Sequence, residues 1–105
     1  MVVAVVYVPF KNKSEAEKIC SVLLKEKLIS CANFLSASSI YFWKGKVAKA
    51  KEVIAICKTK PALVNRIELR IKALHSYDVP CVLSWNVDAN KEFENWVFES
   101  TTNTY

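Results

Sequence analysis

One short loop, His75 to Pro80, collects side chains that could bind a transition metal. His75 is the only histidine, and it follows a helical pattern, so the negative end of a helix dipole would favour its imidazolium form. Tyr77, Asp78 and Cys81 come next and could supply further ligands. In the structural alternative, His75 caps helix carbonyls and Tyr77 bonds to the backbone. Closed metal sites usually take three or four ligands. A single histidine makes such a site within one chain a weak case, so a site shared between subunits is the other possibility.

A second candidate site lies on an extended stretch that carries Glu52 and Lys58. Such a charged pair could bind a small anion or a polar group. The alternative is a solvated face or a salt bridge between subunits, because exposed ion pairs rarely do more. Lysines also surround the preceding turn, where they can discourage unwanted sheet growth; they are Lys44, Lys46, Lys49 and Lys51.

Other classes of site are excluded by what the sequence lacks. No serine or cysteine stands in a catalytic motif with the single histidine, so no triad is indicated and we expect no enzyme. One glycine in the whole chain cannot build a phosphate-binding loop. An RNA-recognition module needs aromatic rings on its third strand, but that run is Val53–Cys57 and has none. We therefore expect no nucleic-acid partner, and no required cofactor.

The element that must position these groups is a long hairpin. Two β-prone runs, 31–43 and 46–59, meet at Lys44-Gly45, and glycine supplies the positive φ of a tight turn. Twelve extended residues reach ~40 Å, whereas a compact domain of this length is only ~33 Å across. The hairpin should therefore overhang its core. Its tip carries three apolar rings that need a partner chain to cover them: Tyr41, Phe42 and Trp43.

Before the hairpin, the sequence predicts one strand and one helix. The run 2–8 is apolar and β-branched, as in a strand covered on both faces, and Pro9 should end it. Ser14 and Glu17 are spaced as a capping box, which predicts the start of the first helix.

After the hairpin come a helix, a strand and a last helix. Pro61 opens the second helix, and 81–87 is a fourth strand. Asp88 or Asn90 can cap the last helix, and residues 101–105 form a polar tail that frays. The last helix should turn three apolar residues inward: Phe93, Trp96 and Val97.

This order predicts an α+β fold, a ferredoxin-like βαββαβ sandwich with an extended hairpin between its second and third strands and a C-terminal helix. Right-handed crossovers would place the helices on one face and leave the other face of the sheet open. An open face in so apolar a chain is a second reason to expect oligomers. A two-layer α+β domain with another strand order is the alternative.

Composition limits the size of the core, the charge, the state of the cysteines and the compartment. A chain of 105 residues, 52% of them hydrophobic, can bury one core. Its net charge of +5 is mild. The four cysteines lack Cys-x-x-Cys spacing, so we expect reduced thiols in the core. The first residues form neither a leader nor a membrane span, so we place the protein in the cytoplasm with no membrane partner.

Four motifs resemble the CutA divalent-cation tolerance proteins, in the same order and spacing. They are Cys31-Ala32-Asn33, Ser39 to Lys46, Glu52 with Lys58-Thr59, and His75 to Pro80. The resemblance covers the whole chain and implies a single CutA-like domain over 1–105. It further implies a homotrimer built from the hairpins and a cytoplasmic role in tolerance of divalent metals, copper above all, with no established reaction.

That resemblance also implies a cleft between subunits, with Glu52, Lys58, Tyr77 and Asp78 as candidate lining residues and a metal role for His75. The nitrogen-regulatory PII proteins share the trimeric architecture, so a sensor of a small anionic metabolite is the rival. This chain departs from the family loop His-Pro-Tyr-Glu-Val-Pro at Ser76 and Asp78. It also carries lysines where the family often has acidic residues at the hairpin turn.

Overall fold

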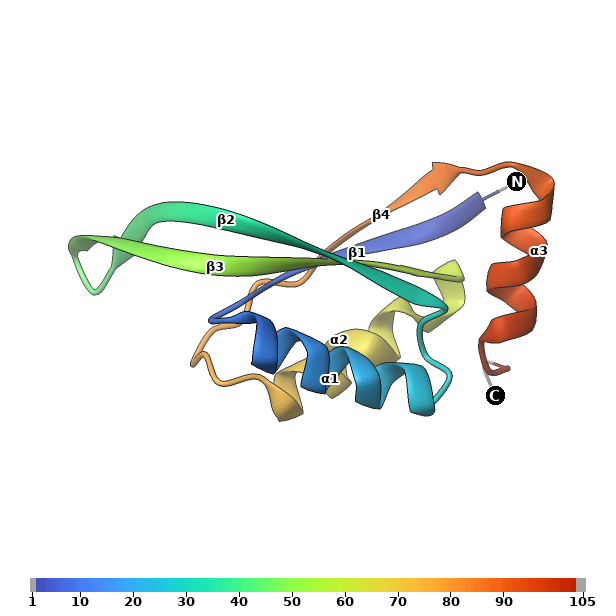
Figure 1. The fold of residues 1–105 in the computed structure, drawn as a ribbon, viewed down its shortest axis with the longest axis horizontal. Helices are drawn as coiled ribbons and strands as arrows, with labels where there is room; N and C mark the ends of the chain where they lie inside the picture. Colours follow the sequence, from blue (N-terminus) through green and yellow to red (C-terminus); the bar gives the residue numbers. More distant parts are fainter. Residues whose placement is uncertain (1, 104–105) are drawn as a thin grey trace.

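Four antiparallel strands and two helices form the predicted two-layer fold in a computed structural model that describes residues 2–103. The strands lie side by side in the order β2-β3-β1-β4, as in a ferredoxin-like sheet. Helices α1 and α2 cover one face of this sheet, and α3 stands at its end (Figure 1). The elements are β1 (Val2–Phe10), α1 (Lys13–Lys25), β2 (Cys31–Trp43), β3 (Lys46–Thr59), the 3₁₀ turn Pro61–Leu63, α2 (Val64–Leu74), β4 (Leu83–Asp88) and α3 (Lys91–Ser100).

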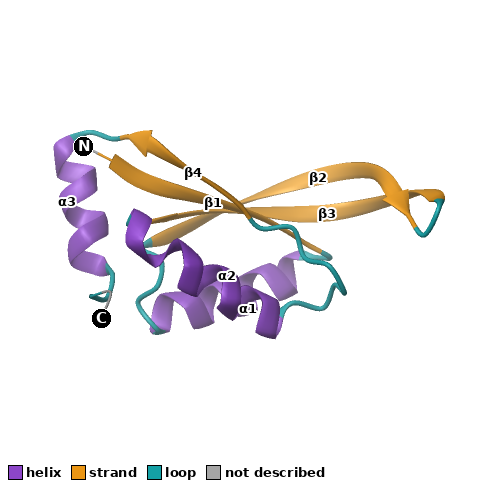
Figure 2. Cartoon of the chain, turned by 180° about the vertical axis from the view of Figure 1, so that it is seen from behind, coloured by secondary structure: helices purple, strands orange, loops and turns teal. Residues whose placement is uncertain are grey.

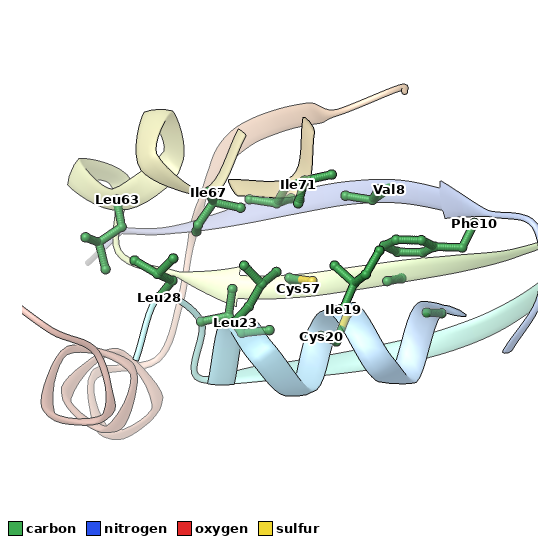
Figure 3. Close-up of a cluster of buried hydrophobic side chains, with 14 residues drawn as sticks. Val8, Phe10, Ile19, Cys20, Leu23, Leu28, Cys57, Leu63, Ile67 and Ile71 are labelled. Atoms are coloured by element: carbon green, nitrogen blue, oxygen red, sulfur yellow. The ribbon is translucent and has the colours of Figure 1, made fainter. Parts of the chain in front are cut away.

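The core lies between the sheet and the helix pair (Figure 3). Residues four apart on a helix share a face, and α1 and α2 each turn such a stripe onto the alternate residues of β1 and β3. The largest fully buried side chains include Phe10, Leu23, Ile29, Leu63, Ile67 and Ile71. Burial of this stripe, at ~25 cal/mol per Å² of apolar surface, holds the hairpin base against the helices.

The hairpin forms as predicted. Lys44 and Gly45 both have positive φ, 51° and 78°, which is the backbone of a type I′ turn. Strand β1 pairs with β3 only as far as Val53, opposite Phe10. Beyond that point residues 37–52, which we name the overhang, continue as a two-stranded ribbon. The molecule is accordingly long, 44 × 24 × 22 Å, so the predicted overhang is confirmed.

The sheet face away from α1 and α2 is open, as predicted. Leu35, Leu83 and Trp85 all expose large apolar side chains. Trp85 and Leu83 lie opposite Val5 and Tyr7 of β1, so these side chains share the uncovered face.

Two predicted boundaries in the first part of the chain are wrong. Strand β1 runs through Pro9 to Phe10, with Pro9 paired to Ile54. Because β4 pairs with β1 only up to Tyr7, Pro9 has a free edge on that side, where a missing N–H is tolerated. The cap of α1 is Asn12 rather than Ser14: Asn12 Oδ1 accepts a 2.8 Å hydrogen bond from the amide of Glu15.

The C-terminal part needs two corrections. On α3, Val97 is fully buried, but Trp96 is exposed rather than inward-facing. Thr101 is buried, its hydroxyl donating to the Val97 carbonyl at 2.9 Å, and the Thr102 amide donates to the Lys27 carbonyl. The predicted fraying is therefore wrong for residues 101–102, while 104–105 lie outside the described residues. Asn90 occupies the cap position of α3, and its side chain makes no capping hydrogen bond.

The four cysteines are all free thiols. Cys20 and Cys57 are buried in the core, as predicted, and Cys31 is half-buried. Cys81 is exposed, so its predicted place in the core is wrong. Its strand begins only at Leu83, and Cys81 remains in the preceding loop.

Candidate functional site

A cavity of about 550 Å³ lies between the overhang and the loop that joins α2 to β4. Figure 2 shows that this loop lies at the end of the body from which the overhang projects. We name this cavity the overhang pocket. It brings together side chains far apart in sequence, chiefly Tyr41, Trp43, Glu52, Tyr77, Asp78 and Cys81.

Tyr77 and Glu52 join the two walls of the overhang pocket. The Tyr77 hydroxyl donates a 2.8 Å hydrogen bond to Glu52 Oε2. Partial burial, together with the bonded and negatively charged Glu52, raises the pKa of Tyr77 well above its ordinary value. Tyr77 therefore stays a neutral donor, and it fixes the loop to the base of the overhang. The sequence analysis placed both residues in a cleft between subunits, which stays a prediction; within one chain, the structure brings them into contact.

His75 holds the same loop to β1. Its Nε2 lies 2.7 Å from the Pro9 carbonyl, and its Nδ1 accepts a 3.1 Å hydrogen bond from the Tyr77 amide. Since Nδ1 accepts, Nε2 carries the proton and donates to Pro9. The ring also stacks on Phe10, with centroids 4.8 Å apart.

Both ring nitrogens of His75 are thus engaged, and a metal ion would have to displace one of these bonds. Within residues 2–103, no group of three or more His, Cys, Asp or Glu side chains is placed to hold an ion. The metal role of His75 stays a prediction. The alternative interpretation had the His75 side chain cap helix carbonyls. The ring bonds instead to the carbonyl of Pro9 on β1, which is 66 residues away in the sequence.

Lys58 does not reach this pocket. It stands six residues from Glu52 on β3, roughly 20 Å along an extended strand, and its Nζ donates to Asn33 Oδ1 on β2. The overhang pocket is lined by the carboxylates of Glu52 and Asp78, and none of its described lining residues is a lysine or arginine. Its charge therefore suits a cation better than an anion.

The three rings at the tip are exposed in the single chain. Successive strand residues point to opposite faces, so Tyr41 and Trp43 face the overhang pocket, whereas Phe42, at 78% exposure, faces away from it. The sequence reading missed Val47, which lies opposite Phe42 and exposes its side chain on the same face, and Ile40, which is exposed at the rim of the overhang pocket.

Cys81 and Ser76 complete the loop. Burial and the nearby Glu52 carboxylate raise the pKa of the Cys81 thiol, which keeps it protonated. Partial burial opposes ionisation of Glu15, but hydrogen bonds from Ser76 and the Lys11 amide outweigh it and lower the pKa of Glu15.

Comparisons with known proteins agree with this architecture. The family model of the CutA1 divalent ion tolerance protein matches residues 4–100. A divalent-cation tolerance protein CutA from Pyrococcus horikoshii is 43% identical over 98 residues, which is 92% of this chain and 96% of that protein.

Solved structures agree as well. A crystal structure of CutA1 from Pyrococcus horikoshii superposes with a TM-score of 0.92 at 40% identity, covering 95% of this chain and 99% of that one. CutA1 from Oryza sativa gives a TM-score of 0.92 at 33% identity, covering 97% of this chain and 95% of that one. The chain therefore belongs to the CutA1 family of divalent-cation tolerance proteins.

Proposed function

We propose that this chain acts as a homotrimer in tolerance of divalent metal ions, with copper as the first ion to test. In this proposal it is a binding or scaffold protein rather than an enzyme, and it works in the cytoplasm. The observation that carries the proposal is the overhang, whose apolar rings remain 42–78% exposed in the described chain. The number three follows from the family resemblance.

The edges of the overhang support assembly through one particular strand. Strand β2 lies at the edge of the sheet, and from Cys31 to Trp43 it carries no charged residue. A long uncharged edge is a template for pairing with another chain. The lysines that were predicted to discourage sheet growth lie on the other strand, β3. They stand in the part of β3 that does not pair with β1, and they are Lys46, Lys49 and Lys51. A neighbouring copy would therefore add at β2.

The overhang pocket supports a role with cations. Glu52 and Asp78 give it negative charge, and Cys81 adds a sulfur. Because the described residues of one chain hold no three-ligand cluster, a bound ion would take ligands from more than one copy. The engaged ring nitrogens of His75 leave no free imidazole base, which supports the non-enzymatic reading. Nothing in the lining supports a PII-like anionic metabolite.

The cellular compartment of the chain is a separate question from its assembly and its metal role. The relative from Archaeoglobus fulgidus is described as a periplasmic divalent cation tolerance protein CutA. For residues 2–103, no helix is both long and apolar enough to span a bilayer. The cytoplasm remains our proposal for this chain, and fractionation of cells that express it tests the point directly.

Sedimentation tests the assembly. We expect the wild-type chain to sediment as a trimer at micromolar concentration, and the double variant Phe42→Ser/Trp43→Ser to shift towards monomer. Leu69→Ser is the matched control, because Leu69 is a similarly exposed apolar residue, at 68%, but lies on α2. A wild-type chain that sediments as a monomer would overturn the proposed trimer.

Calorimetry with Cu²⁺ tests the metal role. Glu52→Gln and Asp78→Asn should each weaken binding, whereas Glu68→Gln on α2 should not. His75→Gln tests the histidine, because glutamine can still donate to the Pro9 carbonyl while it removes the imidazole. If Glu52→Gln, Asp78→Asn and His75→Gln all bind Cu²⁺ as the wild type does, the overhang pocket and its loop are not the copper site.

A further inference from the structure

The overhang pocket combines aromatic walls with a negatively charged lining. The rings come from Tyr41 and Trp43 on β2 and from Tyr77 in the loop between α2 and β4. The carboxylates are those of Glu52 and Asp78, and no lysine or arginine is among the described residues that line the cavity. Aromatic faces carry partial negative charge, so the rings and the carboxylates both attract a cation.

Neither carboxylate is paired with a cation of its own chain. Both ion pairs found among residues 2–103 involve side chains of α2 and lie outside this pocket. Glu52 Oε2 accepts a hydrogen bond from the Tyr77 hydroxyl, which is a neutral donor, so the negative charge of Glu52 is not cancelled. A carboxylate binds most strongly to a donor that is itself positively charged. The lining therefore offers a bound cation two carboxylates that no side chain of the described chain neutralises.

The size of the cavity favours an organic cation over a bare metal ion. Its volume, about 550 Å³, lies within the range of roughly 300–1,000 Å³ that holds small organic ligands. A metal ion usually takes three or four ligands in a closed site, and no group of three or more His, Cys, Asp or Glu side chains among residues 2–103 supplies them. An organic ammonium ion needs only aromatic faces and a carboxylate, and one chain holds both.

One ring of this pocket already contacts an ammonium group of the protein. Lys44 Nζ lies over the ring of Trp43, 5.8 Å from its centroid, within the roughly 6 Å that characterises a cation–π interaction. The side chain of lysine is a butyl chain that ends in an ammonium group. The Trp43 ring thus accepts an alkylammonium ion in this fold, although Lys44 is not itself a lining residue of the pocket.

We propose that the overhang pocket binds an alkylammonium ion, that is, a protonated primary amine. The ammonium group donates hydrogen bonds to the carboxylates of Glu52 and Asp78. The rings of Tyr41 and Trp43 lie against it, and the alkyl chain contacts Val79 at the apolar part of the lining. This inference deepens the proposed function and rests on it in one respect, namely that the overhang pocket is a site for cations. It depends neither on copper nor on the number of copies.

A titration with butylamine and with butanol tests the inference, because the two molecules have similar size and only the amine is charged at neutral pH. Nuclear magnetic resonance detects weak binding and shows which side chains respond. We expect the wild-type protein to bind butylamine about tenfold or more tightly than butanol. The indole signal of Trp43 should shift with butylamine.

Variants of the ring and of the carboxylates locate the site. Trp43→Leu should weaken butylamine binding about threefold or more. Trp96→Leu is the matched control and should leave binding unchanged, because Trp96 is 45% exposed, against 42% for Trp43, but lies on α3. Glu52→Gln and Asp78→Asn should weaken the binding of butylamine but not of butanol. Glu52→Gln still accepts the Tyr77 hydrogen bond, so it keeps the test valid if circular dichroism shows that Trp43→Leu does not fold.

Three results would overturn the inference: no binding of butylamine at millimolar concentration, equal binding of butylamine and butanol, or butylamine binding that Glu52→Gln and Asp78→Asn leave unchanged. A Cu²⁺ titration of the same protein separates this inference from the proposed function. If Cu²⁺ binding depends on Glu52 and butylamine does not bind, only this inference fails. If butylamine binds and Cu²⁺ does not, the copper role fails and the amine site stands.

Discussion

The same two strands, β2 and β3, behave differently in the two halves of the hairpin. In the body, β3 is covered by β1 at its edge and by α1 on its face, and Ala55 and Cys57 are buried. In the overhang the ladder continues unbroken, but Ile40 and Phe42 are exposed. The backbone of a hairpin satisfies its own hydrogen bonds, whereas its apolar side chains need another surface. The overhang is therefore built for contact beyond its own subunit.

The largest expected effect tests the body. Leu23→Ala should lower the free energy of unfolding by about 3 kcal/mol, because it leaves a cavity in a closed core. Leu69→Ala, on the exposed face of α2, should change it by less than ~0.5 kcal/mol. Urea unfolding at one protein concentration measures both. The variant Ile40→Ala would sharpen the comparison. If it lowers the free energy of unfolding by an amount that grows as the protein is diluted, a second copy buries the overhang.

Thr59 tests the polar side of the body. Its buried hydroxyl donates to the Leu28 carbonyl at 2.6 Å. Thr59→Val should cost roughly 1–2 kcal/mol of the free energy of unfolding, because the carbonyl loses a buried partner. Ser38→Ala is the control on the overhang, where water replaces any lost bond. Equal effects at the two positions would break the distinction between body and overhang.

The turn tests the overhang itself. Gly45→Ala should cost about 1 kcal/mol, because alanine resists the positive φ of this position. No atom lies within 4 Å of the added Cβ, so the cost is one of backbone conformation and not of a clash. Lys44→Asn is the opposite control and should stabilise slightly, since asparagine tolerates the left-handed region. Both are measured by urea unfolding followed by circular dichroism.

The smallest effect concerns the hydrogen bond between loop and overhang. The folded chain holds the Tyr77 proton above pH 10, the ordinary value, whereas the unfolded chain releases it there. The stability that this group adds is thus complete below pH 10 and is lost as the pH rises above it. Tyr77→Phe should unfold with a shallower decline between about pH 10 and 11.

Glu52→Gln should reduce the same decline by lowering the pKa of Tyr77 towards its ordinary value. Identical pH profiles for the wild type and Tyr77→Phe would show that the bond contributes nothing to the joining of the two regions.

Local signals predicted the fold well. The Lys44-Gly45 turn and the element order depend on neighbours in sequence, and both are confirmed. The predicted cap, Ser14, was wrong because asparagine also caps helices, and Asn12 stands two residues earlier in the cap position. Only the extension of β1 to Phe10 decides between them.

The candidate site was less predictable, because its contacts span the chain. Glu52 and Lys58 look like a pair in sequence, yet they share a strand at a separation that no salt bridge can span. The partner of His75 is a carbonyl on β1, and the partner of Tyr77 is a carboxylate on β3. Such partners are set by the packing of the loop and not by residue spacing.

The sheet narrows from four strands to two where β1 ends, and this makes the overhang a lever arm. From Glu52 to the turn it extends roughly 23 Å, so a rotation of about 10° at its base moves the tip by ~4 Å. Two-stranded ribbons also twist more readily than wide sheets. The Tyr77 hydroxyl is hydrogen-bonded to Glu52 at the base of the overhang. This one bond therefore influences the position of the Tyr41 and Trp43 rings near the tip.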